Sequence, residues 1–465
     1  MKTRVSFSPF LQLIMNKNIS KVEIMEKGEI TKTLLILGIP MIISMLVTAL
    51  YNIVDTYFVS SLGTHQSAAV AIAFPISLYF SGIGLTFGVG AVSYISRLLG
   101  AKKNEEANIV ATVSFYTSII FAIFLAIFLI VFIRPILIFM GATETVIPFA
   151  LEYTVIFIVS TFLSTINITM GNIAIAQGQT TVTLKSMLCG AILNIILDPL
   201  FIKYLAMGVK GAAIATLISQ IVTLIIYFYF FFIGNSYIKI KLNNFKPTLS
   251  IYIEVIKVGM FMFILQVLTG FSITLISNKA KIYGVAAVSA MGIVLRIVAL
   301  GVNVIFGFMK GYQPFAGYNY GAKNINRVKE ITKKSIEIIT LYSLIWSIVI
   351  FIFSKEIMSI MIKDPEVIKI GEKALRYNTI LFFTFGFQFT FATLYLSMGK
   401  AFIGGILNIG RQGLFLIPSI IILNNILGLK GIMLAQPAAD IISIFVTICV
   451  VIYFKRLQKR KFPTI

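Results

Sequence analysis

Charged residues are scarce in this chain of 465 residues, where Asp, Glu, Lys and Arg make up 12% and hydrophobic residues make up 58%. The mean hydropathy is correspondingly high, at +0.97. So few polar side chains cannot cover the water-facing surface of a globular protein of this size. The composition excludes an ordinary soluble protein and predicts an integral membrane protein.

Cysteine and histidine are almost absent. The two cysteines, Cys189 and Cys449, lie within apolar runs and lack the CxxC spacing of zinc and redox sites, which argues against a disulfide framework. The one histidine, His65, is expected in an outer loop, and we find no paired metal-ligand motif. We therefore expect neither an enzyme nor a bound cofactor.

Long apolar runs recur along the chain, each with at least the ~20 residues that cross a bilayer as a helix. Because these runs are apolar on all sides and longer than barrel strands, an outer-membrane barrel is excluded. The expected fold class is an all-α integral membrane bundle. Its twelve predicted spans are 34–60, 68–98, 108–133, 148–175, 182–205, 210–233, 255–279, 285–312, 332–353, 368–397, 401–427 and 430–454.

Acidic residues are also few, with 17 Asp and Glu against 39 Lys and Arg. The basic residues cluster before the first span, in alternate links and after the last span, which all fall on one side of a bundle with twelve helices. The positive-inside rule makes that side cytoplasmic. We therefore expect a multi-pass protein of the bacterial cytoplasmic membrane, with both termini cytoplasmic, that contacts anionic lipid and not nucleic acid. The outer link 354–373, which holds four lysines, departs from the rule.

The chain repeats itself at an offset of about 221 residues. Gly100-Ala-Lys102 matches Gly321-Ala-Lys323, and Gly208-Val-Lys-Gly211 matches Gly428-Leu-Lys-Gly431. An even number of helices in each half predicts two lobes related by a pseudo-twofold axis along the membrane normal, as in two-lobed transporters. The predicted parts are an extension 1–30 that is cytoplasmic or disordered, lobes 31–233 and 255–454, a cytoplasmic linker 234–254, and a basic tail 455–465.

Two carboxylates stand inside the apolar runs of the first lobe, Asp55 and Asp198, without acidic counterparts at the 221 offset. A charge at the centre of a membrane helix costs roughly 2.5–3.5 kcal/mol, which a partner, a proton or a cation offsets. Asn194 shares a helix face with Asp198, as Tyr51 does with Asp55, because each pair is four residues apart.

Counting about 1.5 Å per residue along each helix places Asp55, Asp198 and Thr216 in the outer half of the bilayer. With Asn194 they predict a set of oxygen ligands for Na⁺, or a carboxylate pair that shares a proton. The structural alternatives are that Asp198 caps a helix end and that Asp55 lies at the headgroup level.

Two prolines within the predicted helices, Pro40 and Pro199, each remove a backbone hydrogen bond. They are candidate hinges because proline kinks a helix.

The chain resembles the multidrug and toxic compound extrusion (MATE) transporters, in particular the DinF-like branch. The segments that carry the resemblance are Gly38-Ile-Pro40, Tyr51-Asn-Ile-Val-Asp-Thr-Tyr-Phe-Val59, Gly100-Ala-Lys-Lys-Asn104, Leu193-Asn-Ile-Ile-Leu-Asp-Pro-Leu-Phe201, Gly208-Val-Lys-Gly-Ala-Ala213 and Gly311-Tyr-Gln-Pro-Phe-Ala-Gly-Tyr-Asn-Tyr-Gly321.

This resemblance implies a V-shaped transporter that rocks between inward-facing and outward-facing states. It implies export of drugs or toxic metabolites, amphipathic and often cationic, against inward H⁺ or Na⁺ flow. It also implies that Tyr51, Asp55, Asn194, Asp198 and Thr216 form the cation site and that the first helix bends at Pro40. Gln266 stands where the family's second-lobe acid is expected, which argues against a cation site in that lobe.

Three further residues are candidate contacts to the exported compound, together with Gln266: Met170, Gln177 and Gln313. We expect the transporter to act as a monomer. The alternative function is a flippase for lipid-linked oligosaccharide or polysaccharide, which would require cations in the central cavity. The cations within the spans that would serve this role are Lys185, Lys279, Arg296 and Lys310.

Overall fold

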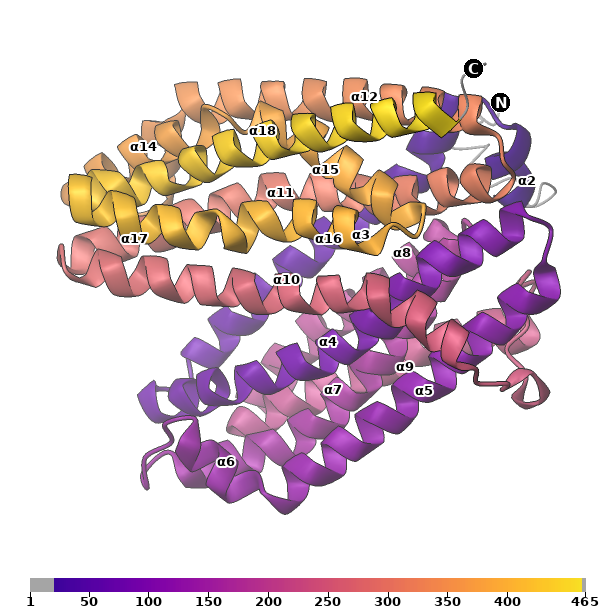
Figure 1. Cartoon of the computed structure of the whole chain (residues 1–465). Helices are drawn as coiled ribbons and strands as arrows, with labels where there is room; N and C mark the ends of the chain where they lie inside the picture. The colour runs from indigo at the N-terminus through magenta and orange to yellow at the C-terminus, as the bar shows by residue number, and fades with distance from the viewer. Residues whose placement is uncertain (1–20, 462–465) are drawn as a thin grey trace, which may run out of the picture.

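The computed structural model describes residues 21–461, and the regular secondary structure within them is entirely helical (Figure 1). Within residues 21–461, eleven helical segments are long and apolar enough to cross a bilayer, and one bent pair of helices makes a twelfth. The prediction of an all-α membrane bundle with about twelve spans is therefore confirmed.

The described part of the first half begins with the short helix α2 (Lys21–Lys27) and continues through six membrane spans. Its helices are α3 (Ile30–Ser60), α4 (Thr64–Gly100), α5 (Asn104–Val131), α6 (Ile133–Phe139), α7 (Ile147–Ala176), α8 (Thr180–Pro199) and α9 (Gly208–Phe228). The last two continue into the π-helical segments η1 (Leu200–Tyr204) and η2 (Tyr229–Ile233).

The second half follows a link that contains the short 3₁₀ helix η3 (Leu242–Asn244). Its segments are α10 (Leu249–Lys281), α11 (Val285–Gly321), α12 (Ile325–Ile352), α13 (Ser354–Met361), α14 (Pro365–Thr379), α15 (Phe383–Ser397), α16 (Ala401–Ile409), η4 (Gly410–Leu414), α17 (Leu416–Leu427) and α18 (Leu429–Lys461).

The tenth predicted span is not one straight helix, because α14 and α15 meet at an angle of 50°. Its start is fixed locally: Oδ1 of Asp364 accepts hydrogen bonds from the backbone N–H groups of Glu366 and Val367, and Pro365 occupies the first turn. An N-cap aspartate followed by proline favours this helix start. The eleventh span is likewise interrupted, by the π-helical segment η4.

The two halves form two lobes that meet through closely packed helices, with α4 against α10 and α11, and α3 against α11 (Figure 1). A Cβ atom on Gly100 would lie 1.8 Å from the backbone oxygen of Tyr318, and one on Gly321 would lie 2.0 Å from that of Arg97. Residues 97 and 318 are themselves 221 apart, so the contact is reciprocal between the repeats. The repeated glycines therefore mark where the helices of the two lobes touch backbone to backbone.

The sequence predicts that the extension 1–30 is cytoplasmic or disordered. The prediction of disorder is wrong for residues 21–27, which form the helix α2. Residues 1–20 lie outside the described residues, but α2 is a helix whose Val22 and Met25 are buried in the main apolar core. These two residues are three apart and so share one helix face. Nδ2 of Asn319 also donates a hydrogen bond of 3.0 Å to the backbone oxygen of Met25.

The predicted boundaries of the linker and of the tail also differ slightly from the helix boundaries in the structure. The helix α10 begins at Leu249, inside the predicted linker 234–254, and α18 continues through most of the predicted tail to Lys461.

Candidate functional site

Three of the predicted polar residues meet between α8 and α9. Nδ2 of Asn194 donates hydrogen bonds to Oδ1 of Asp198, at 3.3 Å, and to the hydroxyl of Thr216, at 3.5 Å. All three side chains are buried, and Asp198 has no exposed surface. The spacing of four residues along α8 thus produces the expected shared face, and α9 supplies the hydroxyl.

The other two predicted residues approach from α3, which packs against α8. Tyr51 lies against Thr216, and the carboxylate of Asp55 is close enough to Asp198 for the two to interact electrostatically. Asp55 is only partly buried, in contrast to Asp198. The structure therefore brings all five predicted cation-site residues into one cluster, which we call the polar cluster, on α3, α8 and α9.

Two buried oxygens of this cluster, Oδ2 of Asp198 and Oδ1 of Asn194, have no hydrogen-bond partner among the described residues. Buried polar atoms in proteins are almost always paired, so such atoms require an explanation. Both atoms are hydrogen-bond acceptors. Two neighbouring acceptor oxygens favour a proton or a hard cation as their partner. The donor set thus fits either H⁺ or Na⁺.

The alternative in which Asp198 caps a helix end finds no support in these contacts. The next long helix, α9, begins after Met207 without any side-chain cap. The backbone after Asp198 continues directly from α8 into η1, at Pro199. The hydrogen bond of Asp198 is made with Asn194 instead.

One residue near the polar cluster was missed by the sequence reasoning. Tyr153 of α7 is buried and lies within electrostatic range of Asp55, Tyr51 and Asp198. A tyrosine in an apolar helix carries no local signal of this role, because only the packing of α7 beside the cluster places it there.

The two candidate hinges differ in their surroundings. Around Pro40, α3 runs without a break from Ile30 to Ser60, and the hydroxyl of Ser44 donates a hydrogen bond of 2.8 Å to the backbone oxygen of Pro40. Pro199 stands where the α-helical geometry of α8 changes to the π-helical geometry of η1. The structure thus shows a local change of helix type at Pro199 and a continuous helix at Pro40.

The four candidate contacts to an exported compound have different environments. Met170 is buried in the main apolar core, Gln313 is buried with an unpartnered Nε2, and Gln266 is exposed on α10. Gln177 holds the link between the lobes, since its Oε1 accepts hydrogen bonds from the backbone N–H groups of Tyr237, at 2.8 Å, and Ile238, at 3.2 Å. These contacts give Gln177 a structural role that the sequence did not reveal.

A buried acid of the second lobe was also missed. Asp440 of α18 forms an ion pair with Arg411 of η4, with Nε 2.8 Å from Oδ1, and both side chains are at most 3% exposed. The Nε–H group of Arg411 does not point at this oxygen and makes no hydrogen bond with it. Instead, Nη2 of Arg411 donates a hydrogen bond to Oδ2 of Asp440, and Nε2 of Gln436 donates one to Oδ1 of Asp440. The second lobe therefore does contain an intramembrane acid, but a cationic side chain neutralises it.

The cations that would favour a flippase are spread over the bundle. Lys185 and Arg296 are exposed, whereas Lys279 and Lys310 are partly buried. Arg296 and Lys310 are 14 residues apart on α11, about 21 Å along the helix axis. Lys279 lies at the last turn of α10.

Two lobes of membrane-spanning helices, with an acidic polar cluster in one of them, are typical of membrane transporters. The MatE family model matches residues 40–200 and 259–422, one segment in each half of the chain. The chain therefore belongs to the MATE family. Membership confirms the predicted family and the prediction of a transporter rather than an enzyme.

Curated relatives and solved structures agree with this assignment. The chain is 27% identical to the multidrug export protein MepA of Staphylococcus saprophyticus over 427 residues, which cover 92% of this chain and 94% of the relative. It is 27% identical to MepA of Staphylococcus aureus strain MSSA476 over 408 residues, 88% of this chain and 90% of the relative. A solved structure described as the outward-facing conformation of a multidrug resistance MATE family transporter of the MOP superfamily superposes with a TM-score of 0.89, at 26% identity, over 96% of this chain and all of the other.

Proposed function

We propose that this chain is a cation-coupled multidrug efflux antiporter of the cytoplasmic membrane of a bacterium. It exports amphipathic, often cationic compounds in exchange for inward H⁺ or Na⁺, works as a monomer and has both termini in the cytoplasm. The observation that carries the proposal is the pair of buried, unpartnered oxygens on Asp198 and Asn194, beside the second carboxylate of Asp55. The names of the staphylococcal relatives support the class of substrate.

The polar cluster couples ion binding to a conformational change because its members lie on separate helices. Asp55 belongs to α3, which also packs against α11 of the other lobe, whereas Asp198 belongs to α8. A cation between these two carboxylates removes their mutual repulsion and draws α3 toward α8. The ion shifts the balance between the two states only as far as it binds one of them more tightly.

The distribution of cations in the bundle supports drug export over lipid-linked sugar export. A phosphate-bearing substrate requires clustered cations, whereas Lys185, Lys279, Arg296 and Lys310 are dispersed over three helices and different depths. The ion pair of Arg411 with Asp440 leaves that guanidinium neutralised.

The test is dye transport in everted membrane vesicles, with the lumen loaded either with acid or with Na⁺. We expect gradient-driven dye uptake by the wild type, and a loss of about tenfold or more in Asp55→Asn and Asp198→Asn. Asp364→Asn is the matched control, because asparagine keeps the N-cap of α14. Full gradient-dependent uptake by both cluster variants would overturn the proposed site.

A further inference from the structure

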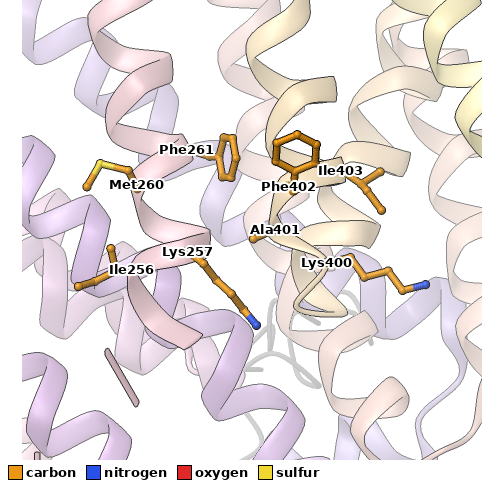
Figure 2. Close-up of a pocket in the computed structure, with 8 residues that line it drawn as sticks. All are labelled: Ile256, Lys257, Met260, Phe261, Lys400, Ala401, Phe402 and Ile403. Atoms are coloured by element: carbon orange, nitrogen blue, oxygen red, sulfur yellow. The ribbon is translucent and has the colours of Figure 1, made fainter. Parts of the chain in front are cut away.

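A pocket opens between α10 and α16 (Figure 2), and none of its lining residues belongs to the polar cluster. Its volume is about 620 Å³, within the range of roughly 300–1,000 Å³ that is typical of small-molecule sites. Apolar side chains form its walls, among them Met260 and Phe261 from α10 and Phe402 from α16. Met260 is 42% exposed and Phe402 is 71% exposed, so the groove presents large apolar side chains at the surface of the bundle, as membrane interaction sites do.

The wall of this pocket is fixed by close packing. The ring of Phe261 lies directly on α16, since a Cβ atom on Gly405 would be 2.1 Å from its ring carbon. The rings of Phe261 and Phe402 meet edge to face, with their centroids 6.4 Å apart. The pocket is therefore a preformed groove between two packed helices.

Cationic side chains gather at one end of the groove. Lys257 and Lys400 both line the pocket, and Figure 2 shows the ammonium group of Lys257 directed into the space between the two helices and that of Lys400 directed away from it. Arg97 of α4 also reaches this end, since a Cβ atom on Gly399 would lie 2.6 Å from its Nη1. Glu254 forms ion pairs with both Arg97 and Lys257. Three cations and this one acid leave a net charge of +2 (3 − 1).

The position of this cluster matches the headgroup region of a bilayer. Arg97 lies in the last turn of α4, and Lys400 directly precedes the first residue of α16. The N-terminus of α16 has no side-chain cap, so its helix dipole adds to the positive field of the cations. A positive end at the interface and an apolar wall toward the bilayer core match the two parts of a phospholipid.

We propose that this groove binds an anionic phospholipid of the surrounding bilayer. The phosphate and its acidic headgroup lie against Lys257, Lys400 and Arg97, and an acyl chain lies along Met260, Phe261 and Phe402. Basic pockets between membrane helices hold anionic headgroups in this way, and each lysine near the surface contributes about fivefold in affinity. This site is independent of the coupling cation and of the exported compound.

The test uses quenching of a tryptophan placed in the groove. The chain has one tryptophan, so Trp346→Phe with Phe402→Trp makes the groove the only source of tryptophan fluorescence. The protein is reconstituted in phosphatidylcholine vesicles that contain increasing fractions of dibrominated phosphatidylglycerol or dibrominated phosphatidylcholine. We expect phosphatidylglycerol to bind about fivefold or more in preference, and Lys257→Gln with Lys400→Gln to bring the ratio close to one.

Two controls separate a site from general attraction to a basic surface. Lys239→Gln with Lys241→Gln removes two exposed charges from the link between the lobes and should keep the preference. Leu249→Trp, in the Trp346→Phe background, places a reporter at the exposed start of α10 and should show a ratio near one. Equal quenching by the two lipids at residue 402, the same preference at residue 249, or an equal loss in the control pair of lysines would overturn the proposal.

Discussion

The carboxylate of Glu26 and the ammonium group of Lys102 lie 2.7 Å apart, an ion pair that joins α2 to the link after α4. The hydroxyl of Tyr318 donates a hydrogen bond of 3.2 Å to the same carboxylate. Nδ2 of Asn319 donates a hydrogen bond to the backbone oxygen of Met25, the residue before Glu26. Because Lys102 belongs to the first lobe and Tyr318 to the second, α2 bridges the lobes at this end of the bundle.

The attachment of α2 should depend on pH. Lys102 holds the pKa of Glu26 below its ordinary value of 4.5, and the contact with Glu26 raises the pKa of Lys102. A carboxylate with a lowered pKa contributes stabilisation that is complete above its ordinary pKa and disappears as the pH falls through the lowered value. We therefore expect a spin label at Glu23→Cys, in a Cys189→Ala, Cys449→Ala background, to be immobile at pH 7 and to become mobile only at a pH below the ordinary pKa of glutamate, 4.5.

A charge-neutral variant should reproduce the acidic state without acid. Glu26→Gln removes the ion pair, so the same label should be mobile at pH 7. Glu106→Gln removes a different ion pair of the same end, with Lys103, and should leave the label immobile. A label that stays immobile in Glu26→Gln would show that the buried Val22 and Met25 hold α2 without this ion pair.

The features that the sequence predicted well are those set by local pattern. The spans follow from composition, and the contact of Asn194 with Asp198 follows from a spacing of four residues on one helix. The structure explains the repeated glycines that the sequence shows. The backbone of another helix lies so close to Gly100 and Gly321 that neither position has room for a side chain.

The features that the sequence did not reveal depend on partners far along the chain. The partner of Asp440 is Arg411, 29 residues earlier on another helix, so no local spacing announces the pair. The helix α2 has only seven residues, and its position depends on Asn319, 294 residues away. Tyr153 joins the polar cluster only through the packing of α7.

The ion pair of Arg411 with Asp440 predicts a strongly non-additive pair of substitutions. Removing one partner of a buried ion pair leaves an uncompensated charge and typically costs about 3–5 kcal/mol, whereas replacing both with apolar residues is often neutral. We expect Arg411→Met and Asp440→Leu each to lower the melting temperature in detergent clearly, and the double variant to recover most of the loss. A double variant as unstable as the sum of the two would contradict this interpretation.

The contact of Gly100 with Tyr318 predicts a steric effect. Gly100→Ala would place a Cβ atom 1.8 Å from a backbone oxygen, so α4 and α11 must move apart at this end. Overpacking of this kind costs about 1–3 kcal/mol. We expect a lower melting temperature for Gly100→Ala. Gly292→Ala is the matched control, because nothing lies within 4 Å of its Cβ position, and it should melt at or above the wild-type temperature.

A substitution that removes the hydroxyl of Thr216 distinguishes coupling to Na⁺ from coupling to H⁺. Na⁺ requires several oxygen ligands, whereas a proton requires only one carboxylate oxygen. Thr216→Val removes an oxygen that lies 3.5 Å from Nδ2 of Asn194 and keeps the two carboxylates. We expect this variant to raise the Na⁺ concentration for half-maximal dye transport about tenfold, or roughly 1.4 kcal/mol, and to leave proton-driven transport unchanged. Thr216→Ser keeps the hydroxyl and should match the wild type with either ion. An equal loss with both gradients would show instead that the hydroxyl positions Asn194 and that it is not a ligand of the ion.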